Sequence, residues 1–350
     1  MRLLPVLLVA FASVPMSATA ESPIPPQPDE APRTALVIHA GAGVIERRAL
    51  SHAVEAAVRR ELDRALDAGN RVLKQGGSAL DAATAAIVVL EDSPWFNAGK
   101  GAVFTADATH ELDASVMEGH TRRAGAVAGV TTVRNPIRLA RAVMEHSPHV
   151  MLAGAGAERF ADTRPEIARV ANTWFDTDTR RQQLEKAQAK ERAARAGDTP
   201  SPGTYFGTVG AVALDAQGHL AAATSTGGMT NKRWGRIGDS PVIGAGTWAD
   251  ARCAVSATGW GEFYLRTAAA HAICARVQLR GDTLAAAAEE VINGDIPALG
   301  GDGGAIAMDA DGNIVMPFNT SGMYRGWIGV DGERGTAVFG ENREQRADRK

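Results

Sequence analysis

The run Tyr205-Phe206-Gly207-Thr208-Val209-Gly210 is where the chain changes character most sharply. The residues before it are charged and end in helix breakers, which predicts a flexible stretch. Directly after it the residues alternate as in a strand, with the odd positions from Val209 to Ala213 on one face and the even positions from Thr208 to Leu214 on the other. A flexible stretch that ends abruptly in a Gly-Thr step indicates a place where the chain is cut.

A cut between Gly207 and Thr208 would make threonine the first residue of a core strand. The new α-amine has a pKa of roughly 7.7–8.0, whereas an internal peptide nitrogen is not a base. Cleavage therefore gives one residue both a nucleophilic hydroxyl and its own base. We expect Thr208 Oγ to attack the Gly207 carbonyl, forming an ester that water opens, and we expect the uncut chain to be inactive on other amides.

The N-terminal segment has the pattern of an export signal. Arg2 provides a positive start, Leu3 to Val14 an apolar run, and Ala18-Thr19-Ala20 a small-residue cleavage site. A membrane anchor is the weaker interpretation, because a span needs roughly 20 apolar residues. We therefore interpret residues 1–20 as a signal peptide and residues 21–33 as a proline-rich tether, and we expect an exported protein, periplasmic or secreted.

Composition excludes several classes of function. The formal net charge is −3 and no basic stripe with interleaved aromatic residues is present, so nucleic acid is not an expected partner. No later segment is long and apolar enough for a membrane span, and the histidines form no metal-binding spacing. We interpret the only two cysteines, Cys253 and Cys274, as buried thiols, although export would also permit a disulfide.

The first half of the chain alternates strands and helices. A strand at 35–38 leads into a glycine-rich turn at 39–43 that lacks the spacing of known phosphate-binding loops. Helical periodicity covers 51–74, and Ser78 with Asp81 at the capping-box offset predicts a second helix to about Leu90. Further helices are expected near 136–146 and 150–160.

Residues 177–203 break this pattern. They are rich in charge and alanine, have almost no large apolar residues, and end in Pro200-Ser201-Pro202-Gly203. Such a stretch can form a solvated helix but is not expected to bury a core face. We interpret it as a flexible linker, and an ordinary interdomain linker is the alternative.

The last part contains an internal repeat. Residues 210–228 align without gaps to residues 304–322, and each copy reads strand, D-x-x-G turn, strand and a polar T-[GS]-G exit. Helical patterns at 262–279 and 283–292 lie between the copies. Antiparallel hairpins followed by helices predict sheets covered by helices on their outer faces.

The chemistry-bearing residues of this half are threonines, glycines and one pair of opposite charges. They are Thr208, residues 224–228, Arg236 with Asp239, and residues 258–262. Each feature alone is weak, because threonine favours strands and an Arg–Asp pair is usually a surface ion pair. Together they supply a nucleophile, hydroxyls to orient it, a clamp for a charged substrate, and backbone N–H groups for an oxyanion.

This combination resembles the plant-type asparaginases, also called isoaspartyl peptidases, which are N-terminal-nucleophile hydrolases. The matching motifs are G-T-V-G-A-V-A-L-D, A-A-A-T-S-T-G-G-M-T-N-K, G-R-I-G-D-S-P, G-A-G-T-W-A and T-G-W-G-E, with H-A-G-A-G, E-D-S-P-W-F-N-A-G-K-G and T-H-E-L-D-A-S-V-M-E-G in the first half. The resemblance runs from about Ala35 to Phe339, outside the signal peptide and linker. G-T-V-G favours this branch over the glycosylasparaginases, which typically have D-T-I-G-M.

The resemblance implies an α+β fold, a four-layer αββα sandwich that forms one folded domain. It implies autocatalytic cleavage into an α subunit of residues 34–207 and a β subunit of residues 208–350, assembled as (αβ)₂. The implied enzyme is a threonine amidohydrolase that acts on L-asparagine and β-aspartyl dipeptides. Two alternatives stay open: N4-glycosylasparaginase activity, and a non-catalytic periplasmic protein that binds an amino acid.

The resemblance also implies roles for single residues. Thr208 is the nucleophile, Thr226 hydrogen-bonds it, and Asn97 lies beside it. Arg236 holds the substrate α-carboxylate and Asp239 its α-amine. Thr258 and Gly259 form the oxyanion hole, and Gly261 lines the site. No catalytic cofactor is implied, but a structural sodium ion is, bound by backbone carbonyls of the loop Leu90, Glu91, Ser93, Phe96, Ala98 and Lys100.

Three positions depart from the pattern of the family. Ala40 stands where glycine is usual, Trp260 replaces a smaller residue, and Trp234 stands where a non-aromatic residue is common. The two tryptophans are expected to reshape the entrance of the site. The sequence does not rank L-asparagine against β-aspartyl dipeptides.

Overall fold

The structure is a computed structural model that describes residues 33–43, 45, 47, 50–194 and 207–340. The predicted signal peptide, nearly all of the tether and residues 195–206 lie outside the described residues. The chain from Pro32 onward forms one compact unit.

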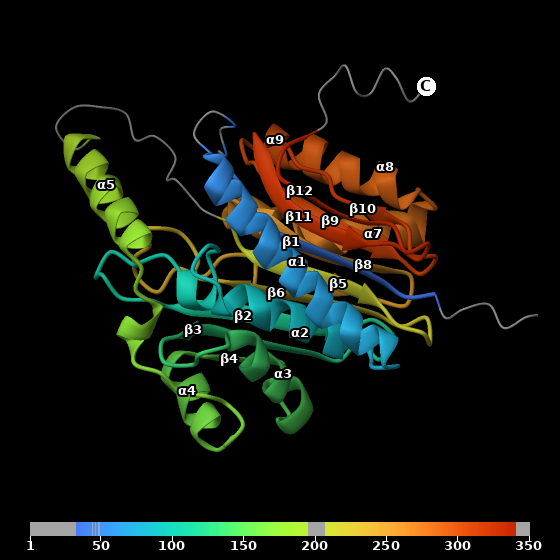
Figure 1. Cartoon of the computed structure of the whole chain (residues 1–350), viewed down its shortest axis with the longest axis horizontal. Coiled ribbons are helices and arrows are strands. Elements are labelled where there is room, and N and C mark those ends of the chain that lie inside the picture. Colours follow the sequence, from blue (N-terminus) through green and yellow to red (C-terminus); the bar gives the residue numbers. More distant parts are fainter. Residues whose placement is uncertain (1–32, 44, 46, 48–49, 195–206, 341–350) are drawn as a thin grey trace, which may run out of the picture. The chain divides into compact units, whose positions relative to one another are not determined.

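Two sheets form the centre of this unit (Figure 1). The larger sheet has the strand order β12-β11-β1-β5-β6-β2-β3-β4 and is antiparallel except where β4 pairs with β3. The smaller sheet has the order β10-β9-β8-β7. The bounds in the larger sheet are β1 Ala35–Gly43, β2 Leu112–Glu118, β3 Ala124–Val130, β4 Met151–Ala153, β5 Val209–Leu214, β6 Leu220–Thr226, β11 Gly322–Ile328 and β12 Arg334–Ala337. Those in the smaller sheet are β7 Thr247–Ala249, β8 Cys253–Gly259, β9 Gly303–Asp309 and β10 Ile314–Val315.

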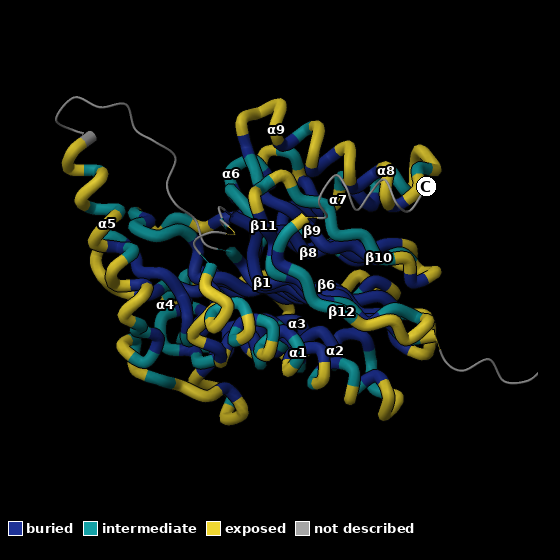
Figure 2. The backbone as a smooth tube through the Cα atoms, turned by 45° about the horizontal axis from the view of Figure 1, so that its top comes forward, coloured by how far each residue is buried: buried dark blue, intermediate teal, exposed yellow. Residues whose placement is uncertain are grey.

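Helices cover the outer face of each sheet, which gives the expected α+β sandwich of four layers (Figure 2). The larger sheet is covered by α1 (His52–Lys74), α2 (Ala79–Asp92) and α3 (Pro136–His146), and the smaller one by α7 (Ala269–Ala275) and α8 (Leu284–Glu289). Shorter or peripheral helices are α4 (Gly154–Asp162), α5 (Asp178–Ala194), α6 (Gly261–Thr267) and α9 (Ile296–Ala298).

The alternation along β5 explains why the strand lies between two cores. Val209, Ala211 and Ala213 point into the cluster beneath α1 and α2. Val212 and Leu214 point into the separate cluster between the two sheets. A strand buried on both faces needs apolar or small residues at every position, and this is what the sequence after Thr208 contains.

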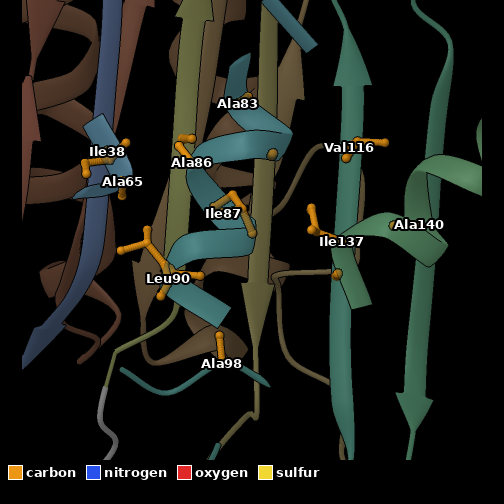
Figure 3. Packing of buried hydrophobic residues seen from close by; sticks show 14 of the residues in the cluster. Ile38, Ala65, Ala83, Ala86, Ile87, Leu90, Ala98, Val116, Ile137 and Ala140 are labelled. Carbon is orange, nitrogen blue, oxygen red and sulfur yellow. The ribbon is translucent and has the colours of Figure 1, made fainter. Parts of the chain in front are cut away.

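Small residues let α2 lie close to the larger sheet (Figure 3). Ala83, Ala86, Ile87 and Leu90 of this helix are fully buried and share one cluster with Ile38 of β1. The helix begins as predicted, because Ser78 Oγ accepts a hydrogen bond from the Asp81 N–H at 3.1 Å and lies 2.8 Å from Asp81 Oδ2. The Ser78 hydroxyl thereby satisfies one N–H group that the first turn leaves unpaired and donates its own proton to the Asp81 carboxylate.

The two copies of the internal repeat belong to different sheets. The first copy forms β5 and β6 of the larger sheet, and the second forms β9 and β10 of the smaller sheet. The helical pattern at 262–279 is also interrupted, because Ala268 adopts a left-handed backbone with φ of 48° between α6 and α7.

The interpretation of residues 177–203 needs correction. Residues 178–194 form α5. Its side chains are not all solvated, since Arg180 is only 5% exposed and Leu184 is 4% exposed. Two inward-facing residues within a charged sequence are too few to produce a visible apolar stripe, which is why the pattern suggested a fully solvated segment.

The interpretation of the cysteines as buried thiols was wrong. Cys253 of β8 and Cys274 of α7 form a disulfide with their Cα atoms 5.5 Å apart. Both residues are buried, and the bond connects the smaller sheet to its covering helix layer. The pairing depends on how α7 packs on β8, which the spacing of the cysteines does not reveal.

Within the described part of the chain, no helix has the length and apolarity to cross a membrane. The same residues contain no group of three or more His, Cys, Asp or Glu side chains arranged to hold a metal ion.

Candidate active site

Thr208 immediately precedes β5 and lies next to the end of β6. The two strands pair antiparallel with Val209 opposite Ser225, which brings Thr208 beside Thr226. Thr208 Oγ donates a hydrogen bond to Thr226 Oγ at 3.1 Å, and Ser240 Oγ lies 3.4 Å away on another side. Thr226 Oγ also accepts from the Gly228 N–H at 3.0 Å. The predicted nucleophile is therefore held by the predicted partner, and it is only 8% exposed.

The turn predicted at 39–43 was wrong: these residues continue β1, whose pairing with β11 shifts register between His39 and Ala42. In this segment Gly41 lies in close contact with Gly207, and a Cβ atom on either glycine would overlap the Cα of the other. Only two glycines can approach this closely, so this end of β1 packs directly against the peptide that precedes Thr208. The Ala42 N–H also donates to Thr258 Oγ at 3.3 Å. The last part of β1 thus connects the Gly207 side of the site to the end of β8.

A row of hydrogen-bonded, buried hydroxyl groups lies beneath Thr208, between the two sheets. Ser256 Oγ is 2.7 Å from Thr224 Oγ, and Thr247 Oγ donates to Thr224 Oγ at 2.5 Å. The row ends at His39, whose Nε2 is 3.0 Å from Ser256 Oγ. Complete burial lowers the pKa of His39 to about 3, so the ring is neutral at ordinary pH. Gly210 leaves the space for this contact, since a Cβ there would overlap both His39 Nε2 and Ser256 Oγ.

Arg236 and Asp239 lie together in one small pocket with Thr208, but they do not form the direct pair that their spacing suggested. Arg236 instead binds Glu262 in a two-point contact, Nε to Oε1 at 2.9 Å and Nη2 to Oε2 at 2.7 Å. Gly261 makes room for this arrangement, because a Cβ there would lie 2.7 Å from Asp239 Oδ1 and 3.0 Å from Arg236 Nη2. Glu262 therefore orients the guanidinium toward the pocket.

Asp239 is buried, and its Oδ2 has no hydrogen-bond partner among the described residues. Burial raises the pKa of Asp239 to about 7, against the opposing effect of the nearby Arg236. A buried carboxylate oxygen without a partner is costly, and a cationic group in the pocket would relieve that cost.

Of the remaining predicted residues, only Gly259 lines this pocket, whereas Thr258 and Asn97 are not among its lining residues. Gly259 lines the small pocket with Thr208, Thr226, Arg236 and Asp239. Asn97 is buried and donates from Nδ2 to the Gly228 carbonyl at 2.7 Å, so it fixes the loop whose N–H holds Thr226. Asn97 therefore acts one step away from the nucleophile. The pocket has a volume of only about 10 Å³, room for about one water molecule.

Comparison with known proteins agrees with this geometry. A family model described as asparaginase matches residues 32–338. The chain belongs to the asparaginase family. It is 51% identical over 298 residues to an isoaspartyl peptidase of Salmonella typhimurium, which covers 84% of this chain and 95% of that protein. It is 52% identical over 299 residues to an isoaspartyl peptidase of Escherichia coli (84% and 92%) and 42% identical over 305 residues to a plant-type L-asparaginase of Pyrobaculum calidifontis (86% and 98%). As a member of this family, the chain is an enzyme of the hydrolase class.

In this asparaginase-family chain, glycines and N–H groups of the loop after α2 pack directly against carbonyl oxygens of the same loop. A Cβ on Gly101 would overlap the Phe96 carbonyl oxygen, and the Ala98 N–H donates to that same oxygen at 3.0 Å. Glu91 is completely buried, which raises its pKa to about 8, and its Oε2 has no partner among the described residues. Backbone oxygens are hard ligands and suit a hard cation such as sodium. The loop therefore offers carbonyl oxygens of the kind that the expected sodium ion would need.

Sequence reasoning missed several residues of this asparaginase-family site. Glu262 belongs to the T-G-W-G-E motif, but nothing local indicated that it binds Arg236. Ser240 belongs to G-R-I-G-D-S-P, and its approach to Thr208 depends on the fold of that loop. His39 was treated only as part of a turn. Trp234 is 96% exposed and does not line the small pocket, so its expected effect on the entrance of the site stays a prediction.

Proposed function

We propose that this chain is an autoprocessed threonine amidohydrolase that hydrolyses L-asparagine and β-aspartyl dipeptides. One observation carries the proposal: Gly207 and the Thr208 nucleophile line the same small pocket as Arg236 and Asp239. The arrangement joins a bond to be cut, a threonine that can become an N-terminus, and two opposite charges suited to a zwitterionic amino acid. The relatives described above, two isoaspartyl peptidases and a plant-type L-asparaginase, are consistent with both substrates.

Self-cleavage begins with Thr208 Oγ attacking the Gly207 carbonyl carbon. The peptide C–N bond breaks, the Thr208 nitrogen takes a proton and becomes an amine, and an ester joins Gly207 to Oγ. Water then hydrolyses the ester, which leaves a carboxylate on Gly207 and a free hydroxyl on Thr208. Thr226 Oγ, which accepts from Thr208 Oγ, orients the hydroxyl for the attack.

The mature site repeats this chemistry on a substrate. The α-amine of Thr208 takes the hydroxyl proton as Oγ attacks the side-chain amide carbonyl, and ammonia or an amine leaves. Arg236 binds the α-carboxylate and Asp239 the α-ammonium. Thr258 and the Gly259 N–H stabilise the oxyanion, a role worth ~2.7–4 kcal/mol per donor. Water then hydrolyses the β-aspartyl ester.

The loop from Leu90 to Lys100 is proposed as a structural sodium site. The backbone carbonyls of this loop would bind the ion and hold the segment that carries Asn97. The ion has no part in the chemical steps. Thermal unfolding in sodium against choline chloride tests the site, and an unchanged Tm would count against it.

Export and assembly are proposed as well. Residues 1–20 would be removed as a signal peptide, and the Cys253–Cys274 disulfide supports an oxidising compartment. Assembly as (αβ)₂ rests on the family resemblance. Cell fractionation and light scattering of the purified protein test the two proposals.

One preparation of purified protein tests the main proposal. A denaturing gel should show two fragments, and Edman sequencing of the smaller one should begin Thr-Val-Gly-Ala. Ammonia release from L-asparagine and aspartate release from a β-aspartyl dipeptide should follow cleavage. A single intact polypeptide with bound amino acid would support a binding protein instead, and a marked preference for glycosylated asparagine would support the sister activity.

A further inference from the structure

The helix α5 lies at the edge of the molecule (Figure 1). It precedes the proposed cut and so belongs to the predicted α subunit, whereas Arg236 and Asp239 belong to the predicted β subunit. The helix nevertheless reaches residues 231–233, which come shortly before Arg236 in the loop that forms part of the small pocket. These three neighbouring residues are connected to α5, either directly or through one other residue.

The direct connection is one carboxylate near the end of α5. Glu191 Oε2 accepts a hydrogen bond from Asn231 Nδ2 at 3.0 Å and another from Arg233 Nη2 at 2.6 Å. The side chains of Arg233 and Glu191 are only 34% and 31% exposed, so this charged contact is partly shielded from solvent. A single carboxylate oxygen of the α subunit therefore holds two residues of the loop.

The indirect connection runs through the segment that precedes β2. Gln188 Nε2 of α5 donates to the Ala106 carbonyl at 3.1 Å, and the Ala106 N–H donates to the Lys232 carbonyl at 2.9 Å. In the same segment the Phe104 carbonyl accepts from the Asn231 N–H at 2.9 Å. The helix and the loop thus contact the same short piece of chain.

The backbone of this loop needs support. Asn231 and Trp234 have positive φ angles of 65° and 55°, and such a conformation costs energy in a bulky residue such as tryptophan. It persists where the surrounding contacts hold it. The Arg236 N–H donates to the Arg233 carbonyl at 3.0 Å. The residue that Glu191 binds therefore also forms the turn that leads to Arg236.

We infer that Glu191 is a positioning residue for substrate binding, acting across the subunit boundary through Arg233 on Arg236. The inference rests on the proposed function, in which Arg236 binds the substrate α-carboxylate. Glu262 already orients the guanidinium, so Glu191 contributes by holding the backbone that carries it. Its loss should weaken substrate binding and leave self-cleavage and the chemical steps unchanged, because Thr226 holds the attacking hydroxyl.

The test measures binding of L-aspartate to the self-cleaved protein by calorimetry, which needs no turnover. Glu191→Gln keeps the size of the side chain and removes its charge, so Kd should rise about threefold, as expected for a partly exposed charged contact. KM for L-asparagine should rise by the same factor while kcat stays at the wild-type value. The matched control is Glu185→Gln, at an exposed position of the same helix, and it should bind as wild type does. An unchanged Kd, or a loss confined to kcat, in Glu191→Gln would overturn the inference.

A double-mutant cycle separates the route through Arg233 from every other contact of Glu191. Arg233→Gln alone should raise Kd by a similar factor, and this measurement stands by itself if Glu191→Gln does not fold. The double variant should bind no more weakly than either single variant, because both changes remove the same contact. Additive losses would overturn the route through Arg233. Wild-type protein that cleaves itself but neither binds L-aspartate nor hydrolyses L-asparagine would show instead that the proposed function is wrong.

Discussion

At the scale of single residues, the geometry around Thr208 separates two tasks. In the proposed self-cleavage, Thr226 would hold the hydroxyl that attacks, and the contact between Gly41 and Gly207 would hold the carbonyl that is attacked. Both tasks would have to be complete before the free amine exists. The uncut chain would therefore place the reacting atoms by packing and hydrogen bonding, and it would gain the general base only through cleavage.

Replacing Thr208 by Ala should abolish both cleavage and hydrolysis, because alanine has no nucleophile. Thr208→Ser should keep part of both activities, since it keeps a hydroxyl but loses the methyl group that restricts χ1. The measurement is the fraction of cut chain on a denaturing gel, with ammonia release from L-asparagine. Cleavage that persists in Thr208→Ala would mean that another group or a protease makes the cut.

The pKa of Asp239 predicts a pH dependence of substrate capture. Because burial raises the pKa of this carboxyl to about 7, its ionised form is lost as pH falls below that value. Competitive inhibition by L-aspartate should then weaken up to about tenfold per pH unit toward pH 5.5, since the α-ammonium loses its partner.

The raised pKa of Asp239 also affects stability. This group favours the folded state at low pH, and that contribution is lost as pH rises through about 7.

The matched control for this prediction is Asp239→Asn. The amide should bind L-aspartate weakly, and any pH dependence that remains then belongs to other groups such as the Thr208 amine. If the inhibition constants of wild type and Asp239→Asn change in parallel with pH, Asp239 is not the group that titrates.

At the scale of elements, the contact between the two sheets depends on Gly210 of β5. The His39 ring from β1 and the Ser256 hydroxyl from β8 both occupy the space beside its Cα. Strands β1, β5 and β8 are therefore in contact at Gly210, two positions after Thr208. A side chain here would push β8 away from β5, and β8 ends at Thr258 and Gly259.

Gly210→Val should lower the free energy of unfolding by several kcal/mol, because overpacking in a buried site forces backbone shifts that cost about 1–3 kcal/mol and here also breaks a buried hydrogen bond. Self-cleavage should slow as well. Gly294→Ala is the control, since a Cβ there meets nothing within 4 Å. Urea unfolding measures both variants, and equal midpoints for Gly210→Val and wild type would contradict the packing argument.

At the scale of the whole molecule, the disulfide strengthens the layer that has the smaller sheet. The smaller sheet has four strands against eight in the larger one, and the bond connects β8 to α7 across 21 positions. The bond lies within the predicted β subunit, so cleavage at Thr208 does not separate its two cysteines.

The double variant Cys253→Ala/Cys274→Ala should lose about 3 kcal/mol of unfolding free energy, the usual effect of opening a loop of this length. Its kcat/KM should stay close to wild type, because neither cysteine lines the active-site pocket. Urea unfolding with and without reductant measures the effect. A wild-type midpoint that does not respond to reductant would show that the bond contributes nothing.

Sequence alone was sufficient for the features that depend on near neighbours in the chain. The alternation after Thr208 and the cap at Ser78 are local patterns, because strand faces and helix ends are set by residues a few positions apart. The family motifs extended these patterns to the fold, and the cleavage step and the nucleophile that they imply stay predictions. Only the tertiary structure decided which distant groups meet: Cys253 with Cys274, Arg236 with Glu262, and Glu191 with Arg233. These contacts follow from how the layers pack, and a pairing set by packing leaves no periodic trace in the sequence.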